Sequence, residues 1–435
     1  MLITKLILLH LLGAFSGIPD RFSEEEFRGI IKDVSKGLKK CKLHYFGPQK
    51  GYGVIATEAI SLGDEIAIDS VFNKYLSFED FEWLDYFQEE HQVVKAVGHL
   101  VYERVYNKEK AGENLWAHLP PSKVESIYNW TQEELGYLDN QFRIKHRIET
   151  PVEYNLGKKN YLKSMSKVPG IEQVCPECLL EQTWMWGYHT VISRAFHITK
   201  YTWKYLQNIK GEEYDKKVYG ICFLPLLELF NHMPRPLGSK ANKSQVGVIF
   251  KRPGSAVMKA DRDFRKGQEV VWSYNNHDNI KLLLKYGFIL DQNIDDKVIV
   301  FYDTNRTCPG NLVRYRKKGA CIFELSVYRV DSQFVKFLFK ELFSITPEES
   351  EPKSLFVVLK RYRNVLLHNN LNRCLSDYKL ISKKLEEGNY ENYRTELVDR
   401  FCKASHWSFF LHLKLLERKV LELYFKYLSL ATQLS

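Results

Sequence analysis

The chain has 435 residues, of which 14% are aromatic and 45% hydrophobic. That length suits roughly two or three domains with real cores, and the aromatic content excludes a long disordered chain. The formal net charge of +10 is spread over local clusters, with no long polybasic tail. Such spreading is typical of a solvated basic face, so we expect no specific nucleic-acid partner.

The first 17 residues, MLITKLILLHLLGAFSG, have the composition of a cleavable secretory signal, with an early lysine, an apolar run and small residues near the end. The run is too short for a comfortable membrane span, and no later stretch is apolar for long enough to cross a bilayer. Three Asn-X-Ser/Thr sequons fit the secretory route; they begin at Asn129, Asn242 and Asn305. We expect residues 1–17 to be a signal peptide.

In chain order, the sequence then predicts a helix, hairpins and a long helical stretch. Residues 23–40 begin with acidic and end with basic side chains, as a short helix does. Residues 43–72 alternate apolar and polar positions around glycine turns, which indicates hairpins. Helices are expected over most of 78–165 and again around 183–196. Strands and turns return at 220–293.

Helical periodicity dominates the rest of the chain. The clearest runs are 331–343, 353–371 and 407–430. We therefore predict an all-α C-terminal domain over 296–435.

Eight cysteines are too sparse for a disulfide scaffold. Cys175-Pro-Glu-Cys178 has the spacing of metal ligands or of a redox pair, yet no second CxxC or CxxH accompanies it. We expect no metal site. A disulfide and two unremarkable thiols both stay open for this pair.

Common enzyme signatures fail in this chain. GYGVIA, at 51–56, matches the dinucleotide fingerprint G-x-G-x-x-G/A, but that motif needs a helix after it, and here a turn and an alternating strand follow. No G-x-S-x-G, H-E-x-x-H or G-x-x-x-x-G-K-[ST] pattern occurs, so common hydrolases, zincins and nucleotide loops lack their signatures.

An apolar run stops abruptly at a polar pair in LLELFNHMPRP, where Asn231-His232 is followed by two prolines. Burying an amide beside an imidazole is costly unless both are hydrogen-bonded. An isolated pair of this kind usually belongs to a capped core element with a satisfied histidine, so the neighbouring motifs must decide its role.

Four segments occur in a fixed order: KGYGVIATEAISLGDEI, SRAF, LLELFNH and GQEVVWSYNNHDNIKLLLKYGF. Together they resemble the SET-domain methyltransferases, in the branch of the RuBisCO large-subunit lysine methyltransferase and the actin histidine methyltransferase. The resemblance covers most of 25–295. It implies an α+β fold: a SET domain of short sheets over 18–295 with a helical insert at 78–190, then the helical C-terminal domain that binds substrate in that branch.

The resemblance also implies a pocket for S-adenosyl-L-methionine. Asn231 and His232 would line it after a knot-like crossing of two segments, and a glycine turn would approach it closely. Arg194 would face the cofactor carboxylate or the substrate channel. Glu228 stands where relatives often carry Asp. The full cofactor-binding set is Lys50, Gly51, Tyr52, Arg194, Glu228, Asn231, His232, Tyr286 and Phe288.

Tyr274 matches the catalytic tyrosine of these relatives. Methyl transfer is an in-line displacement, so the protein mainly aligns the reactants and excludes water. A phenol hydroxyl can hold the nucleophile near the methyl group without being consumed. Relatives usually have Gly after this tyrosine, whereas this chain has Asn275.

The expected acceptor is lysine, in a channel made by Phe196, Leu227 and Tyr286. Histidine-methylating relatives have a polar Asn and a Trp where this chain has Phe196 and Leu227. An unpaired buried imidazole nitrogen costs on the order of 1–3 kcal/mol, so apolar walls favour a lysine stem.

The leading expectation is therefore a protein-lysine N-methyltransferase that uses S-adenosyl-L-methionine, acts on a protein substrate and is a monomer. The alternatives are a histidine N-methyltransferase and a catalytically weak SET-fold binding module. The signal-like leader favours the binding module, because S-adenosyl-L-methionine is made in the cytosol and a secreted enzyme would lack its supply. We expect the secretory pathway if the signal functions, and otherwise the cytoplasm or nucleus.

Overall fold

The computed structural model describes much of the region between residues 29 and 326 and part of a C-terminal helical segment. The described residues are 29, 32–47, 51–69, 83–87, 91–106, 127–130, 152–197, 221–235, 247–252, 255–303, 313–317, 320–326, 396–397, 399–404, 407–408, 411–412, 414–415, 418 and 422. The expected signal at 1–17, the binding residue Lys50 and the helices predicted at 331–343 and 353–371 lie outside them.

The chain forms two compact units. The first comprises Met1–Tyr128 and Pro151–Asn275, and the second Asn129–Thr150 and Asn276–Ser435. The division thus falls after Asn275, whereas the sequence predicts a domain boundary after residue 295.

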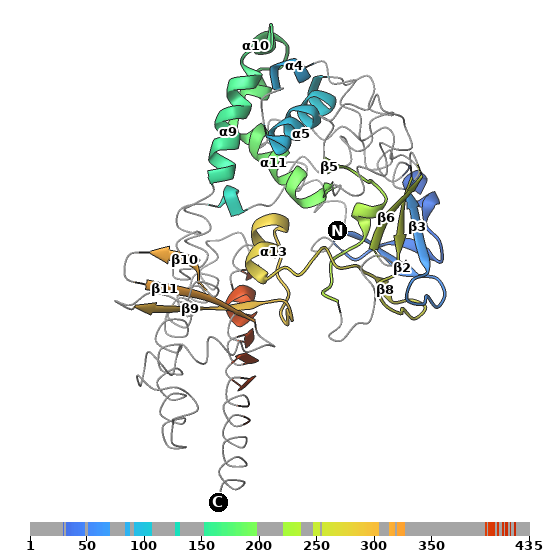
Figure 1. Ribbon diagram of the computed structural model, residues 1–435. Helices are drawn as coiled ribbons and strands as arrows, with labels where there is room; N and C mark the ends of the chain where they lie inside the picture. The colour runs from blue at the N-terminus through green and yellow to red at the C-terminus, as the bar shows by residue number, and fades with distance from the viewer. Residues whose placement is uncertain are drawn as a thin grey trace, which may run out of the picture. The chain divides into compact units, whose positions relative to one another are not determined.

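The strands of the first unit form small antiparallel sheets (Figure 1). One sheet has the order β1-β2-β8, from Cys41–Tyr45, Tyr52–Ala56 and Glu269–Val270. Another has the order β3-β7-β6, from Glu65–Asp69, Ser255–Lys259 and Gly247–Arg252. A short pair joins β4 (Phe196–His197) to β5 (Ile221–Cys222). The single-turn helices η2 and η7 span Ser35–Gly37 and Leu227–Leu229.

Glycine closes the turn between β1 and β2. The amide of Phe46 donates to the carbonyl of Gly51 (2.8 Å), and the amide of Gly51 donates to the carbonyl of Gly47 (2.7 Å). Gly51 has a φ of +70°, a value that side-chain-bearing residues rarely adopt. The predicted hairpin at this place is present. The apolar faces of the sheets enclose one core, which includes Val54, Leu224 and Phe230.

Helices of the first unit enclose a second core. They are α4 (Leu84–Phe87), α5 (Gln92–Val101), α9 (Val152–Met165), α10 (Ile171–Val174) and α11 (Glu181–Arg194), with single turns η3 (Tyr102–Tyr106), η5 (Ile127–Asn129) and η6 (Pro176–Leu179). Helices α5, α9 and α11 pack against one another (Figure 1). Trp184 and Tyr161 are fully buried between them. These helices lie where the sequence places the insert.

The Cys175–Cys178 pair forms a disulfide within this core, which settles one question that the sequence leaves open. Both cysteines are buried, and the hydroxyl of Tyr161 donates to the carbonyl of Cys178 (2.9 Å). The disulfide fixes the turn between α10 and α11.

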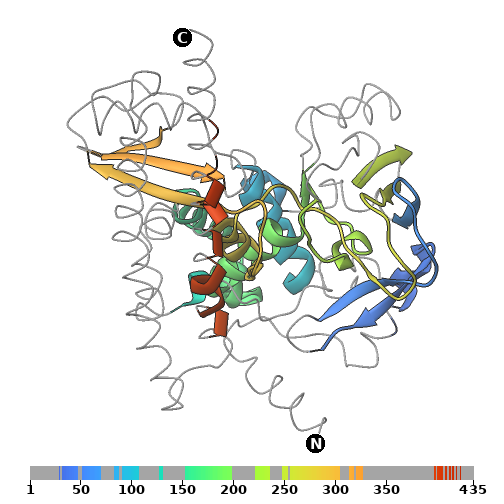
Figure 2. The same ribbon diagram turned by 90° about the horizontal axis from the view of Figure 1, so that it is seen from below.

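The second unit contains α13 (Asn279–Tyr286) and the strands β9 (Lys297–Asp303), β10 (Val313–Lys317) and β11 (Ala320–Ser326). The strands pair antiparallel in the order β10-β11-β9 and lie side by side, in orange, in Figure 2. This sheet corrects the prediction of an all-α domain from residue 296. The physical reason is local, because KVIVFYD consists mainly of β-branched and aromatic residues, which favour a pleated surface, and ACIFELS pairs with it through a centre that contains Ile322 and Phe323.

A buried polar network ties the C-terminal helical segment to the rest of this unit. Asp296 accepts hydrogen bonds from the amide of Asn279 (3.0 Å) and the hydroxyl of Ser408 (2.6 Å). Asn279 also exchanges two bonds with the backbone of Leu290. Within the described residues, no helix is long and apolar enough to cross a membrane.

Candidate functional site: a crossing beneath Tyr274

Two segments far apart in the chain, residues 230–233 and 272–274, run side by side, and we call this place the crossing. The amide of Trp272 donates to the carbonyl of Asn231, and the amide of Met233 donates to the carbonyl of Trp272, both at 3.1 Å. His232 and Trp272 thereby form a parallel bridge. Pro234 has no N–H to continue this ladder, so the chain leaves the crossing there.

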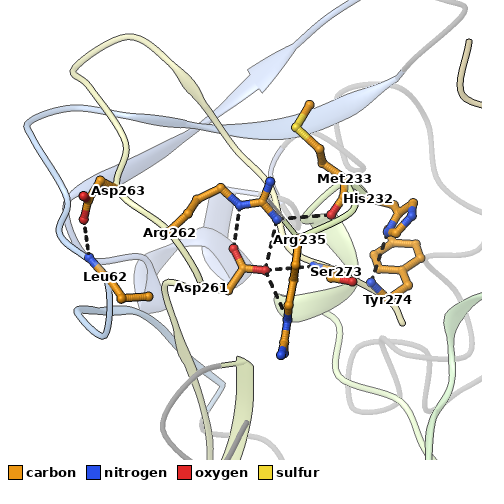
Figure 3. Close-up of polar contacts among 9 residues, drawn as sticks. All are labelled: Leu62, His232, Met233, Arg235, Asp261, Arg262, Asp263, Ser273 and Tyr274. Atoms are coloured by element: carbon orange, nitrogen blue, oxygen red, sulfur yellow. Dashed lines mark hydrogen bonds and ion pairs between the residues drawn. The ribbon is translucent and has the colours of Figure 1, made fainter. Parts of the chain in front are cut away.

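Tyr274 is hydrogen-bonded to the 230–233 segment through both its backbone amide and its side-chain hydroxyl. Its amide donates to Nδ1 of His232 (3.1 Å), and its hydroxyl donates to the carbonyl of Phe230 (2.8 Å). The two rings lie side by side in Figure 3, with centroids 5.0 Å apart. Because Nδ1 accepts this bond, the neutral imidazole carries its proton on Nε2. The polar pair that ends the apolar run is thus hydrogen-bonded.

Asn231 packs closely on strand β2. Its Nδ2 donates to Oε1 of Glu269 (2.8 Å), and Glu269 pairs with Ile55 of β2. A Cβ at Gly53 would lie 2.6 Å from this Nδ2 and 2.8 Å from the ring of Phe46. Only glycine therefore allows β2 to approach Asn231 this closely.

Arg194 and Glu228 form an ion pair beside the crossing. Arg194 ends α11, and its Nη1 lies 3.5 Å from Oε1 of Glu228, whose side chain is 5% exposed. Burial raises the pKa of Glu228 to about 7; the Arg194 charge opposes this rise and Asp69 adds to it. Asp69 accepts a hydrogen bond from the amide of Leu226 (3.0 Å), which holds the start of η7.

Aromatic rings extend from Tyr274 to β4. Phe196 stacks on Trp272 with centroids 5.7 Å apart and planes at 17°, and Trp272 lies 5.5 Å from the ring of Tyr274. The buried indole N–H of Trp272 has no acceptor among the described residues. Sequence reasoning passed over Trp272, although strand alternation puts it on the same face as Tyr274, two residues later.

The predicted site residues are therefore only partly assembled by the described contacts. The structure brings Phe196, Asn231, His232 and Tyr274 to the crossing, with Arg194 and Glu228 beside it. Leu227 is fully buried in the sheet core. Tyr52 begins β2 and lies 5.1 Å from the ring of Tyr45.

Tyr286 and Phe288 belong to the second unit. Their ring centroids are 6.1 Å apart, and the ring of His277 lies 5.9 Å from that of Tyr286. Burial raises the pKa of Tyr286 to about 12. Burial also lowers the pKa of His277 to about 4, with a further contribution from nearby lysines.

Comparison with known proteins gives the fold. No family model matches the chain. The Arabidopsis thaliana protein SET DOMAIN GROUP 40 is 23% identical over 145 residues, which are 28% of this chain and 26% of that protein. Among solved structures, the SET domain of LSMT bound to lysine and AdoHcy matches with a TM-score of 0.56 and 14% identity, over 92% of this chain and 93% of that chain.

Rubisco LSMT bound to sinefungin and monomethyllysine matches similarly, with a TM-score of 0.54 and 16% identity over 92% of this chain and 93% of that chain. At these identities the likeness shows the fold alone. The chain has the fold of the SET-domain methyltransferases, with helices and small antiparallel sheets. The predicted resemblance and the α+β class are confirmed at this level.

Proposed function

We propose that the chain is an S-adenosylmethionine-dependent methyltransferase that acts on lysine side chains of a protein substrate. One observation carries the proposal: the amide and hydroxyl of Tyr274 are both hydrogen-bonded to the Phe230–His232 segment. The rings of Trp272 and Phe196 lie next to Tyr274, and we call these two rings the aromatic wall. The fold supports it, because the matching LSMT structure holds lysine and AdoHcy.

The residues at the crossing fit the polar groups of the cofactor. Asn231 uses its Nδ2 on Glu269, and its Oδ1 accepts no hydrogen bond from the described residues, so it is available to an ammonium donor. The side chain of Arg194 is 31% exposed, and a guanidinium has donors beyond the one facing Glu228, which suits a carboxylate. Asn231, His232, Arg194 and the backbone at Gly51 and Tyr52 would hold the group.

When bound, S-adenosylmethionine supplies a methyl group on a sulfonium centre, which a nucleophile displaces in line. This chain's part is to align the acceptor and exclude water. The hydroxyl of Tyr274 donates to Phe230, and a phenol oxygen is an acceptor as well as a donor, so it can take a hydrogen bond from the nitrogen to be methylated. A lysine must be neutral to react, and burial among aromatic rings lowers its pKa from the usual value of about 10.4.

The aromatic wall favours lysine over histidine as the acceptor. Phe196 and Trp272 are apolar rings on which the aliphatic stem of a lysine can pack. Phe196 gives an imidazole nitrogen no hydrogen-bond partner, and leaving that nitrogen unpaired costs on the order of 1–3 kcal/mol. Leu227, fully buried in the core, adds apolar support behind this site.

The test has two stages with the full chain. Calorimetry first measures S-adenosylmethionine binding, which we expect at micromolar cofactor. Cell lysate is then incubated with the chain and methyl-labelled cofactor, and mass spectrometry locates the new methyl groups, which we expect on lysine. Methyl groups on histidine alone would replace the acceptor, and absence of cofactor binding would leave a SET-fold binding module instead.

A further inference from the structure

One buried carboxylate contacts both parts of the crossing. Asp261 is 2% exposed and follows β7. Its Oδ2 accepts a hydrogen bond from the amide of Ser273 (3.3 Å), the residue between Trp272 and Tyr274. Arg262 binds it with two donors, Nε to Oδ1 at 2.7 Å and Nη2 to Oδ2 at 3.1 Å, and Nε of Arg235 lies 3.9 Å away.

Arg262 extends this contact to the opposite segment. Its Nη2 also donates to the carbonyl of Met233 (3.2 Å), the residue that follows His232 (Figure 3). The carboxylate thus holds the backbone just before Tyr274, while its arginine holds the backbone just after His232. The bond between the amide of Tyr274 and the ring of His232 lies between these two attachments.

Asp261 itself is fixed by a pair of interlocked turns. The amide of Ala260 donates to the carbonyl of Asp64 and the amide of Gly63 to the carbonyl of Ala260, both at 2.9 Å. Asp263 accepts from the amide of Leu62 (2.7 Å), on the side of the turn away from the crossing (Figure 3). The carboxylate is therefore presented from a rigid support.

We propose that Asp261, acting through Arg262, is the positioning residue that sets Tyr274 against His232. The placement of Tyr274 against His232 rests on the contacts alone. The effect of that placement on methyl transfer rests on the proposed function. A charge-assisted contact to a guanidinium is stronger than a neutral one, and both partners here are largely buried, with side chains 1% and 13% exposed. A small shift of Tyr274 would misplace its hydroxyl and so slow methyl transfer.

The deciding variant is Asp261→Asn, which keeps the shape and removes the charge. Its matched control is Asp263→Asn, two residues away in the same turn and bonded to Leu62 rather than to the crossing. Arg262→Gln is the second variant, for use if Asp261→Asn does not fold. It removes the contacts of the guanidinium with Asp261 and Met233, while Asp261 can still accept the hydrogen bond from the Ser273 amide.

Amide hydrogen exchange of Ser273 and Tyr274 reports on the crossing without any substrate. We expect exchange about tenfold faster in Asp261→Asn or Arg262→Gln than in the control, at matched melting temperatures. With a lysine peptide that the wild type methylates, we expect kcat to fall about tenfold or more while KM stays within about twofold. Equal exchange in variants and control, or a change in KM alone, would overturn the proposal. A wild type that binds no S-adenosylmethionine would fail the proposed function, and the exchange comparison would still decide the role of Asp261.

Discussion

The hydroxyl of Tyr274 lies 2.8 Å from the carbonyl oxygen of Phe230, forty-four residues earlier in the chain. Tyr274 and Phe230 are thereby linked across the crossing, and the amide of Tyr274 adds a second bond to His232 (3.1 Å). The phenol cannot rotate freely, because its proton is committed to a backbone acceptor. A hydroxyl held in this way is suited to align a nucleophile.

Removal of this hydroxyl in Tyr274→Phe should slow methyl transfer by about 100-fold, the usual cost of losing one oriented hydrogen-bonding group in an active site. S-adenosylmethionine binding should stay within about twofold, because the ring remains in place. Tyr161→Phe is a matched control, since Tyr161 also donates a hydroxyl to a backbone carbonyl, that of Cys178 at 2.9 Å, but in the helical core. Unchanged turnover in Tyr274→Phe, measured with labelled cofactor, would remove Tyr274 from the catalytic role.

Gly53→Ala tests the close approach of β2 to Asn231. The new methyl group would lie 2.6 Å from Nδ2 of Asn231, so either β2 or the Asn231–Glu269 bond must move. We expect a loss of stability of about 1–3 kcal/mol and about tenfold weaker S-adenosylmethionine binding, measured by denaturation and calorimetry. Gly29→Ala is the control, because a Cβ there meets nothing within 4 Å. Equal effects of the two substitutions would contradict the assignment.

The buried Glu228 should make stability depend on pH. Its pKa is raised from 4.5 to about 7, chiefly by burial, so the folded chain binds the proton more tightly than the unfolded chain. This contribution is fully present below pH 4.5 and is lost as the pH rises to about 7. Glutamine cannot ionise, so the melting temperature of Glu228→Gln should rise relative to that of the wild type as the pH increases from 4.5 to about 7. The same substitution at the exposed Glu58 serves as control, and parallel melting curves for wild type and Glu228→Gln would refute the shift.

Order and spacing of motifs carried the family resemblance, which implied the α+β fold and a crossing of two segments at Asn231-His232, but did not name the Tyr274 segment as the partner. These features are carried by short runs that keep their local character, such as LLELFNH and the hairpin at 43–72. The contacts of Asp261 could not be predicted, because DRD between two strands is typical of a solvated turn. Its burial depends on a tertiary contact with Ser273, twelve residues away, and its arginine reaches Met233 across the crossing.

The strands β9, β10 and β11 were missed for a different reason. Each is seven residues or shorter, and the long helical periodicities that follow them dominated the prediction. Glu269 was missed because an exposed-looking Gly-Gln-Glu turn does not reveal a bond to Asn231. Length and local pattern predict elements, whereas pairing of polar groups depends on the assembled fold.

The last prediction concerns Asn275, the residue after Tyr274, for which we propose the catalytic role. Asn275 has a φ of 150°, a region that favours glycine, and it occupies the position where relatives usually carry Gly. A side chain in such a conformation costs the folded chain about 1–3 kcal/mol of strain, which a glycine would remove. Glycine also raises the entropy of the unfolded chain, and this offsets part of the gain. Asn275→Gly should therefore stabilise the chain by about 1 kcal/mol, measured by chemical denaturation, and should leave turnover equal or higher.

Asn276→Gly is the matched control for this substitution, because Asn276 is also exposed and does not have a positive φ. There the same change relieves no strain and only adds freedom to the unfolded chain, so we expect a loss of about 0.5 kcal/mol. The opposite signs at neighbouring positions separate backbone strain from a general effect of glycine. If Asn275→Gly destabilises the chain as much as Asn276→Gly does, the side chain of Asn275 contributes more than its backbone costs, and the departure from glycine is an adaptation of this site.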